Sequence, residues 1–238
     1  MRYLDLEQLR AIDPVALRSQ KPYPWINPQG ILTEEGFQLL RETLPPLTLF
    51  SSRFGEERHY KQQSHDRFTL EYHDDLDIAP PWKEFIAELR GEDYQSIVSR
   101  LTGNRPFKLF FHWHYTPNGC SVSPHCDARR KLGSHIFYFN TSQDWDPAWG
   151  GETVILDDGG KLSYKSAPHF EDFKQIIPAE AMGNRSLLFF TTKRSWHGVR
   201  PLTCPPGHLR KVFIVVVNQY TLIDRVRRFF GEPSKGYE

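Results

Sequence analysis

Residues 107–127 read FKLFFHWHYTPNGCSVSPHCD. The first ten residues are rich in the aromatic and apolar types that favour β-strands. Pro117, Asn118 and Gly119 follow, and these residue types mark a tight turn. The pattern therefore predicts a strand over residues 107–116, a turn, and a short extended segment that ends at Asp127.

Short β-like runs separated by turn residues continue from this stretch to about residue 220. Gly150-Gly151 and Pro205-Pro206-Gly207 are two of the turn signals. Strands at such short and regular spacing predict a sandwich or a barrel. The candidate strands are residues 107–116, 134–140, 152–157, 162–166, 173–177, 186–191, 198–203 and 210–219.

The part of the chain before residue 107 is rich in helical patterns. Thr33 suits the N-cap of one helix, and Pro80-Pro81 suits the first turn of another. We see no linker between the two parts and predict a single domain over residues 1–238, in which residues 1–106 pack on a β core of residues 107–220. The fold class is mainly β with flanking helices. The candidate helices are residues 5–18, 33–44 and 80–89, with a resumption up to residue 101, and residues 67–72 form a candidate strand.

The composition excludes several classes of protein. Lys and Arg number 30 and Asp and Glu 29, a net charge of +1, so we expect no nucleic-acid or anionic-membrane partner. The 3 cysteines include no CxxC pair, which fits a reducing compartment rather than a disulfide scaffold. We find neither a signal peptide nor an apolar run of the roughly 20 residues that span a bilayer. We therefore expect a cytoplasmic protein, with the oligomeric state left open.

The motif His125-Cys126-Asp127 has the spacing of a metal site. Residues two apart on an extended chain point to the same side, so His125 and Asp127 can address one ion while Cys126 points away. His197, just before a candidate strand, can supply a third ligand. Two imidazoles and one carboxylate form the facial triad of non-haem Fe(II) oxygenases, which leaves coordination positions open.

Two other interpretations of these residues stay open. Imidazole and carboxylate also suit zinc, so a zinc-dependent hydrolase on a cupin-like barrel is one alternative. A catalytically silent binding module on the same barrel is the other.

The motifs around these histidines resemble those of prolyl-4-hydroxylase-like 2-oxoglutarate oxygenases. The likeness covers about residues 20–220 and keeps the motifs in the family's order. The matching segments are residues 115–127 with the HxD motif, 136–140 with an aromatic strand, 149–152 with a GGE turn, and 183–190 and 196–202 with the strands around the last metal ligand.

The resemblance implies a double-stranded β-helix, a jelly-roll or cupin-like barrel of two facing sheets. It implies that His125, Asp127 and His197 bind Fe(II), with 2-oxoglutarate as cosubstrate and O2 as oxidant. Related halogenases replace the aspartate with a small residue, so Asp127 favours hydroxylation. The implied reaction is hydroxylation of a C–H bond in an unidentified small-molecule or peptidyl substrate, with succinate and CO2 as products.

The distal carboxylate of 2-oxoglutarate needs a fixed cation, and a guanidinium suits it because two parallel hydrogen bonds fit a carboxylate. Arg210 stands where the family places this anchor, with Lys211 and Arg200 as alternatives. Tyr115 and Tyr138 match positions where the family places phenols against the cosubstrate. The alternative is that both tyrosines are ordinary aromatic residues of the hydrophobic core.

Three further features remain without an assigned role in this function. Strand alternation puts His112 and His114 on the face opposite Tyr115, so we expect them beneath the helices or in solvent. Residues 51–77 form either a lid over the mouth of the barrel or a solvated connection. Residues 225–230, RVRRFF, form either a docking helix or a packed end.

Overall fold

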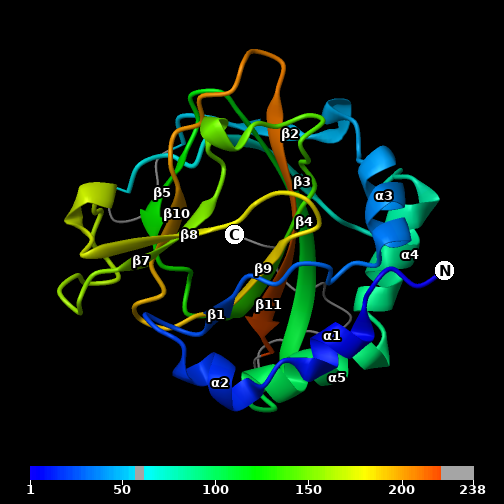
Figure 1. Cartoon of the computed structure of the whole chain (residues 1–238), viewed down its shortest axis with the longest axis horizontal. Helices are drawn as coiled ribbons and strands as arrows, with labels where there is room; N and C mark the ends of the chain where they lie inside the picture. The colour runs from blue at the N-terminus through cyan, green and yellow to red at the C-terminus, as the bar shows by residue number, and fades with distance from the viewer. Residues whose placement is uncertain (57–61, 221–238) are drawn as a thin grey trace, which may run out of the picture.

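Two antiparallel β-sheets face each other in the computed structural model, which describes residues 1–56 and 62–220. The predicted 225–230 element lies outside the described residues. The major sheet has the order β1-β9-β6-β11-β4-β3-β2, and the minor sheet has the order β5-β10-β7-β8. Figure 1 shows the minor sheet on one side of the major sheet and the helices around its other side and lower end.

The β-strands alternate between the two sheets along much of the β core. β4, β6, β9 and β11 belong to the major sheet, whereas β5, β7, β8 and β10 belong to the minor sheet. This winding is the double-stranded β-helix that the sequence predicted. The strands are β1 (Trp25–Ile26), β2 (Ser51–Arg53), β3 (Arg67–Glu71), β4 (Phe107–Pro117), β5 (Val122–His125), β6 (Lys131–Tyr138), β7 (Thr153–Asp157), β8 (Gln175–Ala179), β9 (Ser186–Phe190), β10 (His197–Val199) and β11 (Leu209–Gln219).

Five helices are described, and short 3-10 turns lie between strands. Asp13 caps a second helix where one continuous helix over 5–18 was predicted, because its side chain accepts a hydrogen bond from Val15 N. The helix predicted from Pro80 ends at Leu89, and a second helix follows Arg90 and Gly91, in agreement with the predicted resumption toward residue 101. The helices are α1 (Leu6–Ala11), α2 (Pro14–Ser19), α3 (Glu34–Glu42), α4 (Pro80–Leu89) and α5 (Glu92–Thr102), and the 3-10 turns are η1 (Leu47–Leu49), η3 (Pro147–Trp149) and η4 (Phe170–Asp172).

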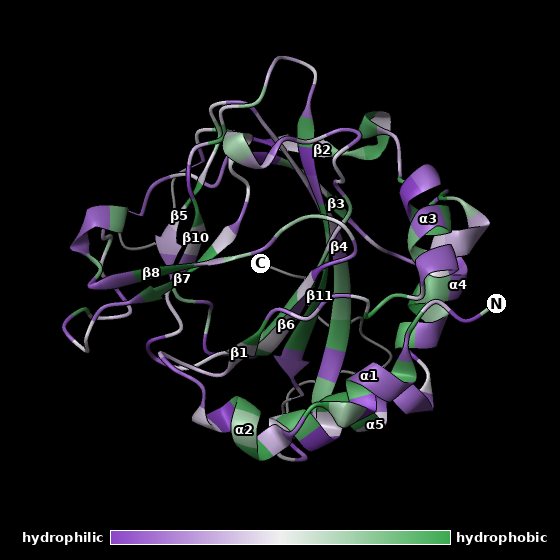
Figure 2. Cartoon of the chain, in the orientation of Figure 1, coloured by the Kyte–Doolittle hydropathy of each residue, from purple (hydrophilic) through white to green (hydrophobic). Residues whose placement is uncertain are grey.

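The largest hydrophobic cluster lies between the helices and the major sheet. Trp82 of α4 packs its ring 5.1 Å from the ring centroids of both Trp113 in β4 and Phe213 in β11. Figure 2 shows mixed hydrophilic and hydrophobic residues on the helices and mostly hydrophobic residues along the central strands. The helices therefore cover one face of the major sheet and leave its other face to the minor sheet. That all these elements form a single domain stays a prediction.

One predicted strand, 162–166, is absent. The Asp158 carboxylate accepts hydrogen bonds from Gly160 N and Leu162 N, and Ser166 N bonds Ser163 O, so local turns use the backbone groups that a strand would need. β2, which the pattern did not predict, is only 3 residues long. No helix among the described residues is long and apolar enough to cross a membrane.

Candidate metal and cosubstrate site

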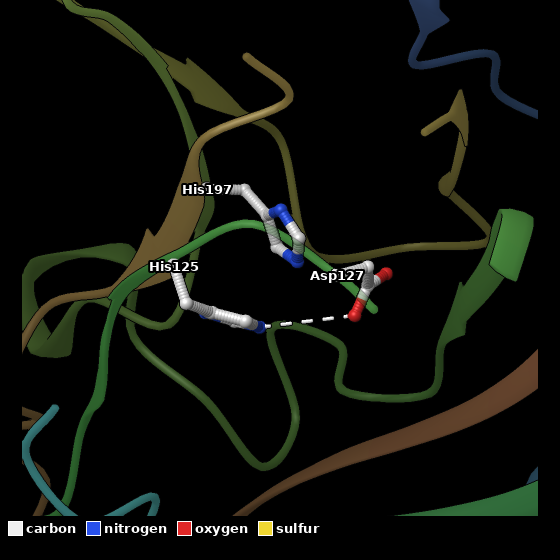
Figure 3. A group of neighbouring side chains, drawn as sticks. All are labelled: His125, Asp127 and His197. Atoms are coloured by element: carbon white, nitrogen blue, oxygen red, sulfur yellow. Dashed lines mark ion pairs between the residues drawn. The ribbon is translucent and has the colours of Figure 1, made fainter. Parts of the chain in front are cut away.

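The three predicted metal ligands meet between neighbouring strands of the minor sheet. His125 ends β5 and His197 begins β10, and the two are direct partners in the strand pairing. Their ring centroids lie 4.3 Å apart. With Asp127, which follows β5, each residue offers one ligand atom, and these atoms all lie within 4.8 Å of one another. Figure 3 shows both rings turned toward the Asp127 carboxylate.

Backbone carbonyls select the tautomer of both imidazoles. His125 Nδ1 lies 2.9 Å from Ser123 O, and His197 Nδ1 lies 2.9 Å from Ser195 O. A carbonyl oxygen only accepts hydrogen bonds, so Nδ1 carries the proton in each ring. The lone pair is therefore on Nε2, the nitrogen that metal-binding histidines of this arrangement present to the ion.

Asp127 is a buried carboxylate with a cationic neighbour. Its side chain and that of Lys131 are each 7% exposed, and Lys131 Nζ lies 2.8 Å from Asp127 Oδ1. Burial alone would raise the pKa of Asp127, but Lys131, His197 and His125 outweigh it and hold that pKa well below its usual range. The carboxylate is thus ionised, and the donor set fits a divalent transition metal such as Fe(II).

A cavity of about 90 Å³ between the sheets contains this group. Its walls come from both sheets, and the apolar residues among them are mostly β-branched. The apolar lining consists of Val122, Ile136, Phe189, Val199, Val212, Ile214 and Val216.

Arg210 lines the same cavity and is only 5% exposed. Its Nε donates to Gly151 O, and its second terminal nitrogen donates to Thr153 Oγ1 over 3.1 Å. Thr153 pairs with Val199, two residues beyond His197, so the guanidinium reaches the minor sheet close to the candidate metal ligands. This arrangement holds a cation at a fixed place in the cavity.

The two alternative anchors lie elsewhere. Lys211 follows Arg210 on β11 and so points to the other face, where its Nζ lies 3.1 Å from Asp144 Oδ2. Arg200 is exposed beyond β10. Of the three predicted candidates, Arg210 is therefore the one in the cavity lining.

Tyr138 lies beside the guanidinium of Arg210. The Arg210 carbon Cζ is 5.5 Å from the centroid of the Tyr138 ring, and the Tyr138 hydroxyl donates to Thr153 Oγ1 over 2.9 Å. Tyr138 and Arg210 thus share a hydroxyl partner. Tyr138 is positioned to support the anchor and to approach a carboxylate bound there.

Tyr115 lies outside the candidate site, contrary to the prediction. Its ring stacks on Phe50 with centroids 4.2 Å apart, and its hydroxyl donates to Pro45 O over 3.0 Å, in the cluster beneath the helices. His114 lines the cavity instead. The prediction that the Tyr115 face of β4 meets the cavity was therefore wrong. Phe111 and Trp113 lie on the same face as Tyr115, and these aromatic residues indicated in the sequence that this face packs in the larger apolar core.

Four further titratable residues line the cavity that sequence reasoning did not assign to the site: His65, Arg67, His114 and Lys131. The His65 ring lies 4.4 Å from that of His125, and its Nε2 is 3.2 Å from Ser123 Oγ. His65 and Arg67 belong to the segment 51–77, whose composition was the only signal for them. The lid function predicted for that segment stays a prediction, since residues 57–61 lie outside the described part.

Residues 110–217 match the family model of the 2OG-Fe(II) oxygenase superfamily. No curated protein matches the chain.

Solved structures share the fold. The Pseudomonas putida prolyl-4-hydroxylase superposes with a TM-score of 0.59 at 12% identity and covers 87% of this chain and 98% of its own. A Trichoplax adhaerens prolyl hydroxylase, solved with a peptide fragment of the hypoxia inducible factor oxygen degradation domain, gives 0.61 at 14% identity over 96% and 94% of the two chains.

The alpha ketoglutarate dependent carbocyclase SnoK from nogalamycin biosynthesis gives a TM-score of 0.61 at 11% identity, over 96% of both chains. Sequence identities this low show only that the fold is shared, whereas the family model matches the sequence of the β core itself. The two comparisons lead to the same group of proteins. The sequence of the β core over residues 110–217 thus resembles the 2OG-Fe(II) oxygenase superfamily, whose members are oxidoreductases that use Fe(II), 2-oxoglutarate and O2.

Proposed function

We propose that this protein is a 2-oxoglutarate- and Fe(II)-dependent hydroxylase that acts on a C–H bond of a small-molecule or peptidyl substrate. In this proposal His125, Asp127 and His197 hold the iron, and Arg210 binds the distal carboxylate of 2-oxoglutarate. The observation that carries it is the convergence of the three ligand atoms within 4.8 Å in a cavity that Arg210 also lines.

The chain's own residues provide geometry and exclusion of water. The two imidazoles and the carboxylate would hold Fe(II) from one side and would leave coordination positions open to the cosubstrate and O2. Arg210 fixes the far end of 2-oxoglutarate through charge-assisted hydrogen bonds, while Tyr138 holds the shared Thr153 hydroxyl. The apolar walls keep bulk water from the reacting atoms.

Bound together, Fe(II), 2-oxoglutarate and O2 supply an oxidative decarboxylation that ends in succinate, CO2 and a hydroxylated C–H bond. The geometry of the protein determines which bond of the substrate lies close enough to react. The two prolyl hydroxylases and the carbocyclase of the same fold lead us to propose a peptidyl or small-molecule substrate.

The proposal is tested by measuring succinate formation from 2-oxoglutarate with and without Fe(II) and O2. We expect formation to require both, and Asp127→Ala to lower it by about 100-fold or more, because the ion loses its one anionic ligand. Cys126→Ala is the matched control, since Cys126 lies between two ligands and is not among the three that converge. Succinate formation that is independent of Fe(II), or that survives in Asp127→Ala, would contradict the proposal.

A further inference from the structure

The polar lining of the cavity is strongly basic. Arg67 on β3, Lys131 on β6 and Arg210 on β11 all line it, whereas Asp127 is the one acidic side chain in its described lining. In the proposed function the formal charges of Fe(II), Arg210, Asp127 and the 2-oxoglutarate dianion sum to zero. Lys131 is paired with Asp127, and Arg67 also lines the cavity, where a low dielectric strengthens the attraction of a cation for an anion.

Arg67 lies in the same row of the major sheet as Arg210. Arg210 pairs with Thr116 on β4, and Phe68 pairs with Tyr115, which puts Arg67 on the other side of Thr116. A terminal nitrogen of Arg67 donates to His65 O over 2.9 Å. His65 in turn packs on the ring of His125, 4.4 Å away. The guanidinium of Arg67 is thus fixed beside the cavity, next to the site but separate from the proposed cosubstrate anchor.

His114 supplies an independent observation. It lines the cavity, and its Nε2 is buried without a hydrogen-bond partner among the described residues. Burial, with Arg67, His112, Lys131 and Arg210 nearby, holds the pKa of His114 well below its usual value, so its ring is neutral. A buried polar nitrogen without a partner destabilises the folded protein, and a bound ligand that donates or accepts a hydrogen bond there would remove this cost.

We propose that Arg67 and His114 form a second anion subsite, which binds a carboxylate or phosphate group of the substrate while Arg210 holds 2-oxoglutarate. This inference rests on the proposed function. It predicts that the substrate is an anion, and that its anionic group binds on the β3–β4 side of the cavity. Arg67 supplies the charge, and His114 supplies one neutral hydrogen bond.

The test uses the protein loaded with Mn(II) and saturating 2-oxoglutarate, so that the Arg210 site is occupied. Acetate and inorganic phosphate are titrated separately, and heat of binding is measured. We expect at least one of the two to bind at a single site, and Arg67→Gln to weaken that binding about tenfold or more, the loss expected for one charge-assisted hydrogen bond. Which probe binds distinguishes a carboxylate subsite from a phosphate subsite.

Three comparisons make the result specific. Affinity for 2-oxoglutarate should change less than about twofold in Arg67→Gln, because Arg210 is intact. Arg200→Gln, which removes an exposed arginine outside the cavity lining, should leave anion binding unchanged. His114→Phe should weaken anion binding several-fold, whereas His114→Gln should retain most of it, because glutamine keeps a hydrogen-bonding group.

Several outcomes would overturn the subsite. The wild type could bind 2-oxoglutarate yet neither anion, or Arg67→Gln could bind the anions as the wild type does. Arg67→Gln could also weaken 2-oxoglutarate binding as strongly as Arg210→Gln, which would make Arg67 part of the cosubstrate site. A wild type that binds no 2-oxoglutarate with Mn(II) would instead reject the proposed function itself, and the subsite with it.

Discussion

The guanidinium of Arg210 is held by protein atoms before any ligand binds. Gly151 O and Thr153 Oγ1 accept two of its hydrogen bonds, and Tyr138 lies against it. A cation fixed in this way loses little conformational freedom when a carboxylate binds, which favours affinity. Lys211, its neighbour in the chain, has its own partner in Asp144 on the other face of β11.

Replacement of Arg210 tests its role as the cosubstrate anchor. Arg210→Gln should weaken 2-oxoglutarate binding about tenfold or more, because charge-assisted hydrogen bonds are worth about 1.5–3 kcal/mol. Binding is measured by anaerobic titration of the Fe(II)-loaded protein. Lys211→Gln is the matched control and should bind 2-oxoglutarate as the wild type does. The opposite pattern, with Lys211→Gln defective and Arg210→Gln intact, would reject the assignment.

At the scale of single residues, the sequence alone predicted which side chains converge where their chemical type and their spacing both indicated a metal site. His125 and Asp127 are two residues apart, and their convergence with His197 follows from strand geometry and motif order. The direction of the Tyr115 side chain was predicted wrongly, because strand alternation divides the residues between two faces without indicating which face packs against the helices. Lys131 gave no signal at all, since its contact with Asp127 depends on how the chain turns between β5 and β6.

Among the elements, the pairing of β5 with β10 determines the distance between two candidate metal ligands. Gly198 follows His197 on β10, and a Cβ atom added there would lie 2.7 Å from Val122 O on β5. Real Cβ atoms do not approach a carbonyl oxygen so closely, so the strands would have to move apart. The absence of a side chain at Gly198 therefore keeps His197 next to His125.

Gly198→Ala should lower metal affinity about tenfold or more, because it displaces His197 from His125. Gly133→Ala is the comparison. Its Cβ would clash with Phe189 O and lie 2.7 Å from Phe190 Cδ1, where β6 pairs with β9 in the major sheet, whereas the metal ligands belong to the minor sheet. Gly133→Ala should cost about 1–3 kcal/mol of unfolding free energy while leaving metal affinity within about twofold.

Metal affinity is measured by calorimetric titration, and stability by urea unfolding. Equal losses of metal affinity in the two variants, or none in Gly198→Ala, would contradict the role of close strand approach at the site.

The long strands and the capped helices were predictable, and the short or locally bonded segments were not. β11 and β4 carry long apolar runs, and both were predicted within one residue of their bounds. β2 has only 3 residues and depends on its pairing with β3, a tertiary effect. The predicted strand over 162–166 failed because Asp158 and the serine-rich turn satisfy the backbone locally.

On the scale of the whole molecule, the fold buries titratable groups on both faces of the major sheet. Burial lowers the pKa of His135 to about 3, and burial with Lys131 and Arg67 nearby lowers that of His112 to about 3. The unfolded chain takes up protons at these residues near pH 6.5, but the folded protein does so only near pH 3. The free energy of unfolding should therefore fall as the pH decreases from about 6.5 toward 3.

His135→Gln should reduce this pH dependence. Between pH 7.5 and 5.5 the wild type should lose about 1.4 kcal/mol more than the variant, the effect of one proton over one pH unit below 6.5. Glutamine keeps an acceptor for the Tyr94 hydroxyl, which lies 3.1 Å from His135 Nδ1. Urea unfolding at both pH values measures the difference. His169→Gln, at an exposed position, should not alter it, and an unchanged pH dependence in His135→Gln would contradict the prediction.

The arrangement of two facing sheets with helices on one side was predictable from the order of helices and strands, but the order of strands within each sheet was not. That order depends on long-range pairing, which leaves no local pattern in the sequence.

β11 is the last strand of the described chain in sequence, yet it lies in the middle of the major sheet between β6 and β4. During synthesis on the ribosome, β4 and β6 emerge long before the strand that joins them. Until residues 209–219 emerge, the two halves of the sheet expose free edges, which neighbouring nascent chains or chaperones can bind. The sheet closes in the same event that delivers Arg210 to the cavity, so a truncated translation product has neither a joined sheet nor its anchor.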